Sequence, residues 1–330
     1  MSPYRRLAAA AAALLLAGCG GGGDADEGAA ASAPAAEGCP PVSELRVEAR
    51  VRVGSGAGPL AASAGTLWVA RPAAGVLTPV NLAGGTPRAG RALRIGGAPV
   101  SLAAGPQGVY VADRDRDRIL RVDPARGRVV ARSVIQAPIK VELAGEKVAS
   151  ISLDDGELSV HDPRTLFAPL IAVAIPALEP IDMAHLAGDL WVLGGSDHGV
   201  APLDIGRNGF VRAGKRLPTR VVGSMDAGRG AIWVALPTAH AVAGVDGETG
   251  ALELLRASRD LRPTAVAVDN CAIWAGDGAG RVQRLDPVQG RPLGPSIRTG
   301  RSLAALVADR GGVWASDPRG GTVVRVAPGG

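Results

Sequence analysis

The sequence predicts an all-β fold: a seven-bladed β-propeller with four-stranded blades, closed into a ring by an N-terminal strand. Two observations predict it, a repeat with a period near 40 residues and a last repeat that lacks its fourth strand. The composition agrees, because 47 glycines, 25 prolines and only 3% aromatic residues among 330 residues indicate many short elements separated by turns.

One position, usually aromatic, marks each repeat. All five Trp residues stand between apolar neighbours, a Tyr takes the same place in Gly-Val-Tyr-Val-Ala-Asp, and an Ala takes the remaining one. The successive spacings are 42, 39, 42, 42, 41 and 40 residues. The seven positions are Trp68, Tyr110, Ala149, Trp191, Trp233, Trp274 and Trp314. One large flat side chain per blade is typical of packing between blades, so we expect core positions rather than a Trp-lined ligand site.

Two further landmarks divide each repeat into strands. A proline precedes the marked position by eleven residues in four repeats, at Pro99, Pro138, Pro180 and Pro263. A turn residue follows it by twelve or thirteen in six repeats, at Asn81, Asp123, Asp162, Asp204, Asp246 and Asp286. Asp-Pro-x-x-Gly is turn chemistry, since Asp bonds the backbone, Pro restricts φ and Gly allows positive φ. We therefore expect an inner strand after the Pro, then the marked strand, a third strand ending at the Asp and a variable fourth.

The ring closure is predicted from the two ends of the propeller. The last repeat stops at Val326-Ala327-Pro328-Gly329-Gly330, after its third strand. Residues 47–53, before the first repeat, alternate apolar and charged as a half-buried strand does. Pairing this segment with the last blade supplies the missing strand and removes two open edges.

The N-terminus carries the pattern of a lipoprotein leader. Arg5 and Arg6 precede an Ala/Leu run over residues 7–17, too short to span a bilayer, and Leu-Ala-Gly-Cys19 follows. This resembles the bacterial lipobox, which implies a signal peptide over 1–18 and a lipid on Cys19; the alternative is an ordinary leader with a chance Cys. Residues 19–42 are predicted to be the lipidated end and a flexible tether, and 43–330 the propeller. Gly20, in place of the Asp associated with inner-membrane retention, implies the outer membrane, facing the periplasm.

The repeat resembles propellers of the YVTN and NHL type, and the streptogramin B lyase (virginiamycin B lyase) family among them. The clearest copy is Tyr110-Val111-Ala112-Asp113 followed by residues 119–127, and the resemblance covers residues 43–330. It implies an architecture that hosts enzymes, binding proteins and scaffolds alike. Streptogramin lyases use a channel-facing His with metal-binding acidic residues. No His falls at the channel positions predicted below, so the lyase activity is not carried over.

Two cysteines remain after Cys19. Cys39 lies shortly before the closing strand and Cys271 lies in the turn between the first two strands of blade six. These places meet on one face of neighbouring blades, so we predict a disulfide; the alternative is a buried thiol at Cys271 and an exposed one at Cys39.

The inner strands predict which side chains face the central channel. Counting from the Pro position, residues +1 and +3 are mostly apolar and are expected to pack between blades, so +2 and +4 face the channel. The candidate ligand-binding residues there are Lys140, Glu142, Asp182, Ser224 and Asp226, all from blades three to five. They form either a polar pocket or a self-satisfied network in which Lys140 pairs with Asp182 and water fills the rest.

A second candidate region is the face that carries the loops between second and third strands. Its candidate residues are Asp113, Asp197, His198 and His240. The histidines and Asp197 suit a metal or acid–base pair, and the alternating charges after Asp113 suit a protein partner; otherwise these are solvated loops. His161 is expected to be exposed. No nucleophile, metal-helix, phosphate-loop or dinucleotide motif occurs.

Together these patterns indicate a membrane-anchored periplasmic propeller that binds a protein partner or small ligand. A net charge of +5, which is +3 without the leader, and the lack of Lys/Arg runs argue against nucleic-acid binding. We expect a monomer and no cofactor beyond the lipid on Cys19. One alternative is a lyase- or lactonase-type enzyme with a divalent metal in the channel. Another is a scaffold similar to the propeller lipoprotein of the outer-membrane protein assembly machinery, although that protein usually has eight blades.

Overall fold

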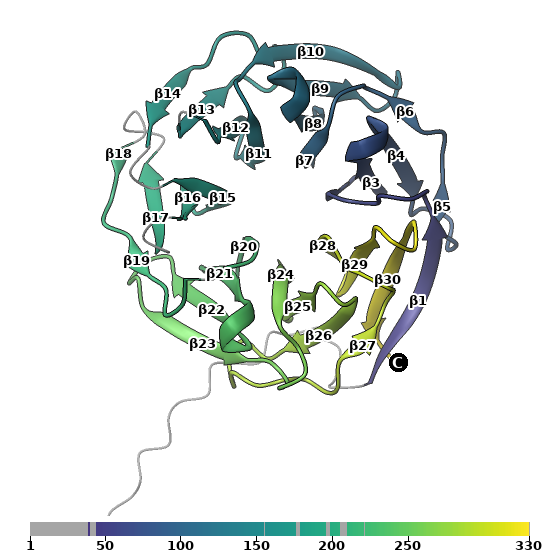
Figure 1. The fold of residues 1–330 in the computed structure, drawn as a ribbon, viewed down its shortest axis with the longest axis vertical. Helices are drawn as coiled ribbons and strands as arrows, with labels where there is room; N and C mark the ends of the chain where they lie inside the picture. Colours follow the sequence, from purple (N-terminus) through teal and green to yellow (C-terminus); the bar gives the residue numbers. More distant parts are fainter. Residues whose placement is uncertain are drawn as a thin grey trace, which may run out of the picture. The chain divides into compact units, whose positions relative to one another are not determined.

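The chain forms a ring of seven antiparallel sheets around a central channel (Figure 1). The computed structural model describes Cys39 and residues 44–154, 156–175, 179–195, 199–204, 210–220 and 222–329. In each sheet the strands follow one another in chain order from the channel outward, except that the last sheet takes its outer strand from the N-terminal side. The predicted seven-bladed propeller is confirmed. Cys19 lies outside the described residues.

The blades share one strand plan. The inner strands are β2 (Leu60–Ser63), β7 (Pro99–Gly105), β11 (Pro138–Ala144), β15 (Pro180–Leu186), β20 (Met225–Gly228), β24 (Pro263–Val268) and β28 (Leu306–Asp309). The second strands are β3 (Thr66–Arg71), β8 (Gly108–Asp113), β12 (Lys147–Ser152), β16 (Asp189–Gly194), β21 (Ala231–Leu236), β25 (Ile273–Asp277) and β29 (Gly312–Asp317). The third strands are β4 (Val76–Asn81), β9 (Arg118–Asp123), β13 (Glu157–His161), β17 (Gly199–Asp204), β22 (Ala241–Asp246), β26 (Arg281–Leu285) and β30 (Thr322–Pro328). The outer strands are β5 (Arg88–Ala89), β6 (Leu93–Arg94), β10 (Arg128–Val134), β14 (Ile171–Ala174), β18 (Phe210–Val211), β19 (Lys215–Arg216), β23 (Leu252–Arg256), β27 (Ile297–Arg298) and β1 (Leu45–Arg52).

In the described part of the chain, short 3₁₀ helices connect the second and third strands of three blades. They are η1 (Pro72–Ala74), η2 (Arg114–Arg116) and η5 (Pro237–Ala239), each of three residues. Among the described residues, no helix is long and apolar enough to cross a membrane.

The marked residue of every repeat lies on a second strand and is buried, as predicted. Trp233, Trp274 and Trp314 are among the largest fully buried side chains, with exposed fractions of 2% or less. The Tyr110 hydroxyl donates to the carbonyl of Pro163 in the next blade at 2.8 Å. These side chains therefore belong to the core between blades, as the spacing predicted.

The turn residues after the third strands adopt the predicted geometry. Asp123 Oδ1 accepts the amides of Ala125 at 2.9 Å and Arg126 at 3.0 Å, and Gly127 closes the turn with φ 59°. The repeat at Asp246 has the same pattern of two amide donors. The pattern Asp-x-x-x-Gly therefore ends the third strand and directs the chain into the fourth.

The N-terminal strand closes the ring. β1 pairs antiparallel with β30, from Leu45 opposite Pro328 to Arg52 opposite Thr322, with one irregularity between Val47 and Ala49. In Figure 1 it forms the outer strand of the blade that also contains the C-terminal strand. The closure predicted from the incomplete last repeat is confirmed.

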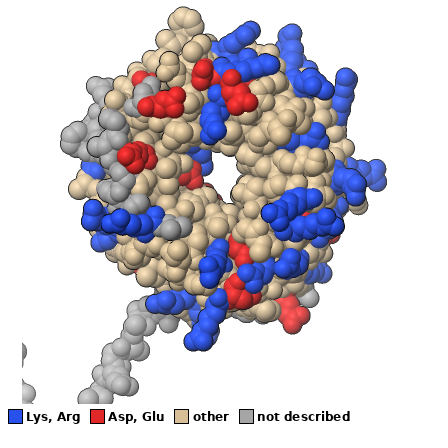
Figure 2. Space-filling model, viewed as in Figure 1, with Lys and Arg blue, Asp and Glu red and all other residues tan. Residues whose placement is uncertain are grey.

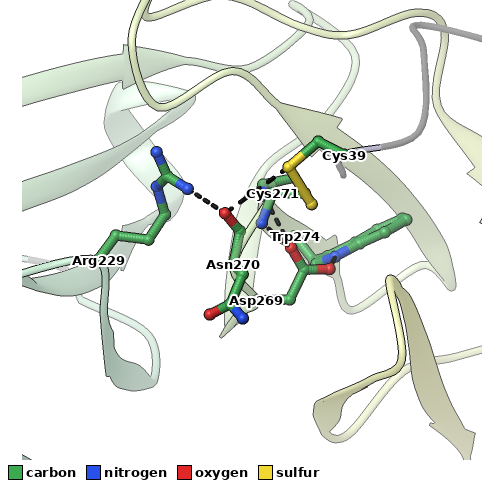
Figure 3. Close-up of a disulfide and its surroundings, with 7 residues drawn as sticks. Cys39, Arg229, Asp269, Asn270, Cys271 and Trp274 are labelled. Atoms are coloured by element: carbon green, nitrogen blue, oxygen red, sulfur yellow. Dashed lines mark hydrogen bonds between the residues drawn. A yellow bond between two sulfur atoms is a disulfide. The ribbon is translucent and has the colours of Figure 1, made fainter. Parts of the chain in front are cut away.

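A disulfide joins Cys39 to Cys271, with Cα atoms 5.4 Å apart, in agreement with the prediction. Asp269 shapes the turn that carries Cys271 (Figure 3). Its Oδ1 accepts the amide of Cys271 at 2.6 Å, and its Oδ2 accepts the indole N–H of Trp274 at 2.8 Å. The crosslink thus attaches Cys39, six positions before the first residue of the closing strand, to a turn held by a core Trp of blade six.

Two expectations about packing are wrong. The pairing of four inner strands with their second strands is irregular between the Pro and the +2 residue, as between Pro180 and Asp182. Such a bulge leaves the +1 residue unpaired with the second strand. Ile181 is consequently 40% exposed instead of packed between blades. His161 is fully buried, because it ends β13 beneath the following loop, where its Nδ1 lies 3.3 Å from the Phe167 carbonyl oxygen.

Replacing Cys39 and Cys271 together by Ser should lower the free energy of unfolding by about 2–5 kcal/mol. The crosslink joins residues 232 positions apart, so its loss increases the entropy of the unfolded chain. Urea unfolding followed by Trp fluorescence measures the difference. Reductant should lower the stability of the parent to that of the variant and leave the variant unchanged. Equal stability of oxidised parent and variant would contradict this role.

Candidate functional site

The central channel is a cavity of about 460 Å³ enclosed by the seven inner strands. All five polar residues predicted to face it do line it: Lys140, Glu142, Asp182, Ser224 and Asp226. Figure 2 shows the channel as an opening through the ring, with basic and acidic atoms on the left of its wall and uncharged atoms on the right. Its volume falls in the ordinary range for small-molecule sites.

The wall of the cavity has two chemically different halves. The charged side chains come from β11, β15 and β20. The facing strands contribute small or apolar groups, which include Leu60, Ala61, Leu102, Ala103, Ala305 and Val307. The bulges add an aliphatic collar at the end where the inner strands begin, formed by Val100, Ile139 and Ile181.

Most of the polar side chains hold neighbouring blades together. Each inner strand has one edge that its own blade leaves unpaired, and an unsatisfied buried amide costs about 1–3 kcal/mol. A side chain at position +2 or +4 of one blade accepts the amide at +3 or +5 of the next. The four pairs are Ser101 with Val141 at 3.2 Å, Asp182 with Met225 at 2.9 Å, Ser224 with Val266 at 3.0 Å and Asp226 with Val268 at 2.8 Å.

Lys140 interrupts this pattern because an ammonium group cannot accept a hydrogen bond. By the pattern of the other blades, an acceptor at position 140 would bond to the amide of Met183 in the next blade. That amide instead donates to Asp182 Oδ1 at 2.9 Å. The same oxygen lies 2.7 Å from Lys140 Nζ. The predicted pairing of Lys140 with Asp182 across adjacent blades is therefore present, and Asp182 uses both carboxylate oxygens in the protein.

Glu142 is the channel carboxylate with the fewest partners. Within the described part of the chain it accepts no amide of the next blade, and its nearest charged neighbour is Lys140, with Oε2 and Nζ 4.0 Å apart. Burial raises the pKa of Glu142 to about 7, an effect that Asp226 and Asp182 increase and that Lys140 and the adjacent Leu143 amide reduce. A proton therefore exchanges at this carboxyl near neutral pH.

Two further ionisable groups of the channel, Asp226 and Lys140, respond to the same surroundings. Burial raises the pKa of Asp226 to about 6, although the amides of Ala227 and Val268 and the charge of Lys140 oppose the shift. Burial also disfavours the charged form of Lys140, but the negative charges of Asp182, Glu142 and Asp226 outweigh it and raise its pKa. The site thus combines a permanent ammonium group with two carboxyls that change charge in the physiological range.

The loop-face candidates do not form a site in the described residues. Asp197 and His198 lie outside them. His240 occupies a left-handed turn at φ 50°, and its Nδ1 lies 2.9 Å from the Leu261 carbonyl oxygen. Asp113 is not a loop residue, contrary to expectation: it ends β8, is fully buried, and accepts the amide of Ala98 at 2.9 Å and the Nε–H of Arg118 at 2.8 Å.

Metal-ligating groups do not converge in the described residues, where no three His, Cys, Asp or Glu side chains are close enough to hold one ion. The channel carboxylates show why, since Asp182 and Asp226 direct their oxygens at backbone amides. The signal that sequence reasoning missed is this bonding role. This role can be recognised in the sequence only when an acceptor at position +2 or +4 of one repeat is aligned with position +3 or +5 of the next repeat.

Comparisons with known proteins find relatives in structure but not in sequence. No protein-family model and no curated protein matches the chain. Virginiamycin B lyase from Staphylococcus aureus is similar with a TM-score of 0.65 and 14% identity, over 86% of this chain and 99% of that one. Hydrazine synthase from Kuenenia stuttgartiensis has a TM-score of 0.71 and 15% identity, over 82% and 95%. BamB from Moraxella catarrhalis has a TM-score of 0.60 and 15% identity, over 86% and 98%.

At this identity the likeness shows the propeller fold alone. The three proteins bear names of quite different kinds, two enzymes and BamB, so the fold itself does not select a function. The residues that line the channel, rather than the fold, carry the information about function.

The free energy of unfolding of the parent should fall as the pH rises, and replacing Glu142 by Gln should make this fall smaller. The pKa of Glu142 is raised from 4.5 to about 7, so between these values the folded state keeps a proton that the unfolded chain releases. The free energy of unfolding of the parent therefore falls across this window, and the variant should be the more stable of the two at pH 8.

Urea unfolding at pH 4, 6 and 8 measures this difference. Glu146→Gln, in the exposed turn of the same blade, is the matched control and should follow the parent at every pH. Parallel profiles for Glu142→Gln and the parent would show that the channel does not perturb this carboxyl.

Proposed function

We propose that this protein is a ligand-binding propeller of the cell envelope, tethered to the periplasmic side of the outer membrane through a lipid on Cys19. The leader pattern supports the anchor, and the channel supports the binding. One observation carries the proposal: Glu142 lies in the polar half of the cavity and, among the described residues, caps no amide of the next blade. Burying ionisable groups that the ring does not need costs free energy, which ligand contacts offset.

An enzyme of the lyase or lactonase type has less support. A divalent metal in the channel would need carboxylate ligands such as Asp182 and Asp226. Asp182 is committed to Met183, Met225 and Lys140, and Asp226 to Ala227 and Val268. These bonds direct the two carboxylates at backbone amides, no three metal-ligating side chains converge among the described residues, and the carboxyl with the fewest bonds is Glu142.

A scaffold for a protein partner is the second candidate, and a surface feature favours it. Phe167 is 81% exposed and Leu170 is 60% exposed, both in the loop between the third and outer strands of blade three. Adjacent exposed apolar side chains of this size are common at protein contacts. An empty channel in the experiment below would make this surface the leading site.

Native mass spectrometry of the full chain, purified gently from membranes, should show a bound small molecule in the parent. Ala304 is exposed and lines the cavity, so Ala304→Trp should block the channel and remove the bound mass. The reason is steric, since an indole fills space that the ligand needs. A ligand retained by the blocked variant would place binding elsewhere, and a parent without ligand would contradict the proposal.

Cys19→Ser provides the control for the anchor. This variant should move from the membrane fraction to the periplasmic fraction and still carry the same bound mass, because the tether and the channel are separate. A variant that stays in the membrane fraction would contradict lipid anchoring at this residue.

A further inference from the structure

We propose that the channel ligand is a small amphiphilic cation, with an ammonium head at Glu142 and Asp226 and an apolar tail against the aliphatic collar. This inference rests on the proposed ligand-binding function and names the class of ligand. It depends on three features of the described residues: the charge balance of the cavity, the depth of its charged groups, and the exposed aliphatic side chains at its mouth.

The charge balance of the cavity favours a cation. Among the described residues that line it, Lys140 is the only cationic one, facing the carboxylates of Glu142, Asp182 and Asp226. Lys140 is already paired with Asp182 at 2.7 Å, whereas its Nζ lies 4.0 Å from Glu142. Two carboxylates thus lack a close cation of their own, and an anionic ligand would be repelled by both.

The depth of these groups sets where an ammonium head would lie. Glu142 and Asp226 stand at the same level of blades three and five, two residues deeper along the strands than Lys140, or roughly 6–7 Å. Blade four lies between them and contributes Ala184 at that level, a buried residue that brings no charge. Their oxygens also have capacity left, since Glu142 caps no amide of the next blade and Asp226 accepts one amide per oxygen.

The mouth of the cavity suits an apolar tail. Val100, Ile139 and Ile181 line this end of the cavity, and Ile181 is 40% exposed. The opposite wall adds Ala305, while Ala61 and Val307 lie deeper, at the level of Glu142 and Asp226. Aliphatic surface that faces channel water is stabilised when a ligand covers it, at roughly 25 cal/mol per Å². A ligand with a cationic head beside Glu142 and Asp226 and an apolar body near the mouth matches both ends of the cavity.

The test uses hexylammonium as the probe, with methylammonium, hexanoate, hexanol and Ca²⁺ for comparison. Calorimetric titration and thermal unfolding of the full chain at pH 8 keep both the amine and the two carboxyls charged, because the pKa values of Glu142 and Asp226 are about 7 and about 6. Hexylammonium should bind most tightly and raise the unfolding temperature. Tighter binding of hexanoate, hexanol or Ca²⁺ would overturn the assigned class.

Variants locate the two ends of the probe. Glu142→Gln should weaken hexylammonium by about tenfold or more, the effect of losing one hydrogen bond to a charged group, while Glu146→Gln should leave it unchanged. Ile181→Ser should weaken hexylammonium about fivefold but leave methylammonium unaffected, with Val134→Ser, 80% exposed outside the cavity, as its control. Unchanged affinity in both cavity variants would overturn the inference.

A measurement on the parent alone covers the case in which a variant fails to fold. Hexylammonium affinity should fall about tenfold or more between pH 8 and pH 5, because Glu142 and Asp226 gain protons over that range. A pH-independent affinity would contradict binding at these carboxyls.

The outcomes separate this inference from the proposed function. If hexanoate or hexanol binds the parent and not Ala304→Trp, the channel binds ligands but the class is wrong. If no probe binds while native mass spectrometry finds a channel ligand, the class is again wrong. If neither finds a ligand, the proposed function itself fails.

Discussion

The ring depends on how seven inner strands satisfy the edges that their own blades leave unpaired. A single sheet would expose such an edge to water, but here it lies against the next blade and the channel. At three of the boundaries between described blades, side chains on the channel side of one blade accept the amides of the next, one position further along the strand. The repeated offset keeps neighbouring inner strands in one register and directs polar side chains to the centre of the molecule.

This constraint gives the channel residues two kinds of role. Ser101, Ser224 and Asp226 bond to the backbone of the following blade, and Asp182 does so while also pairing with Lys140. Glu142 makes no such bond among the described residues, yet burial and its acidic neighbours raise its pKa to about 7. A group that the fold does not use, kept partly protonated in a small cavity, is where we expect a ligand to act.

Much of this arrangement follows from the sequence, because repeat spacing and turn chemistry are local signals. The aromatic positions, the Asp turns, the closing strand, the disulfide and the channel-facing residues of blades three to five were all predicted from position in the repeat. The exposure of Ile181 was not predicted, because the bulge between Pro180 and Asp182 interrupts the alternation of the strand while the sequence pattern stays the same. The burial of Asp113 and His161 was missed because both depend on loops folding over them. The capping of amides was missed because it joins residues about 40 positions apart.

The most direct test compares two carboxylates that face the same cavity. Urea unfolding at pH 8 should show that Asp226→Ala lowers the free energy of unfolding by about 1–3 kcal/mol, because the amides of Ala227 and Val268 lose their acceptor. Glu142→Ala should lower it by none, because that carboxyl caps no amide of the next blade among the described residues. Burial raises the pKa values of both carboxyls, so the ionisation of each opposes folding at pH 8 and the difference between the variants reports the lost amide acceptor. Equal losses in the two variants, or a larger loss in Glu142→Ala, would contradict the division between residues that hold the ring and residues left for a ligand.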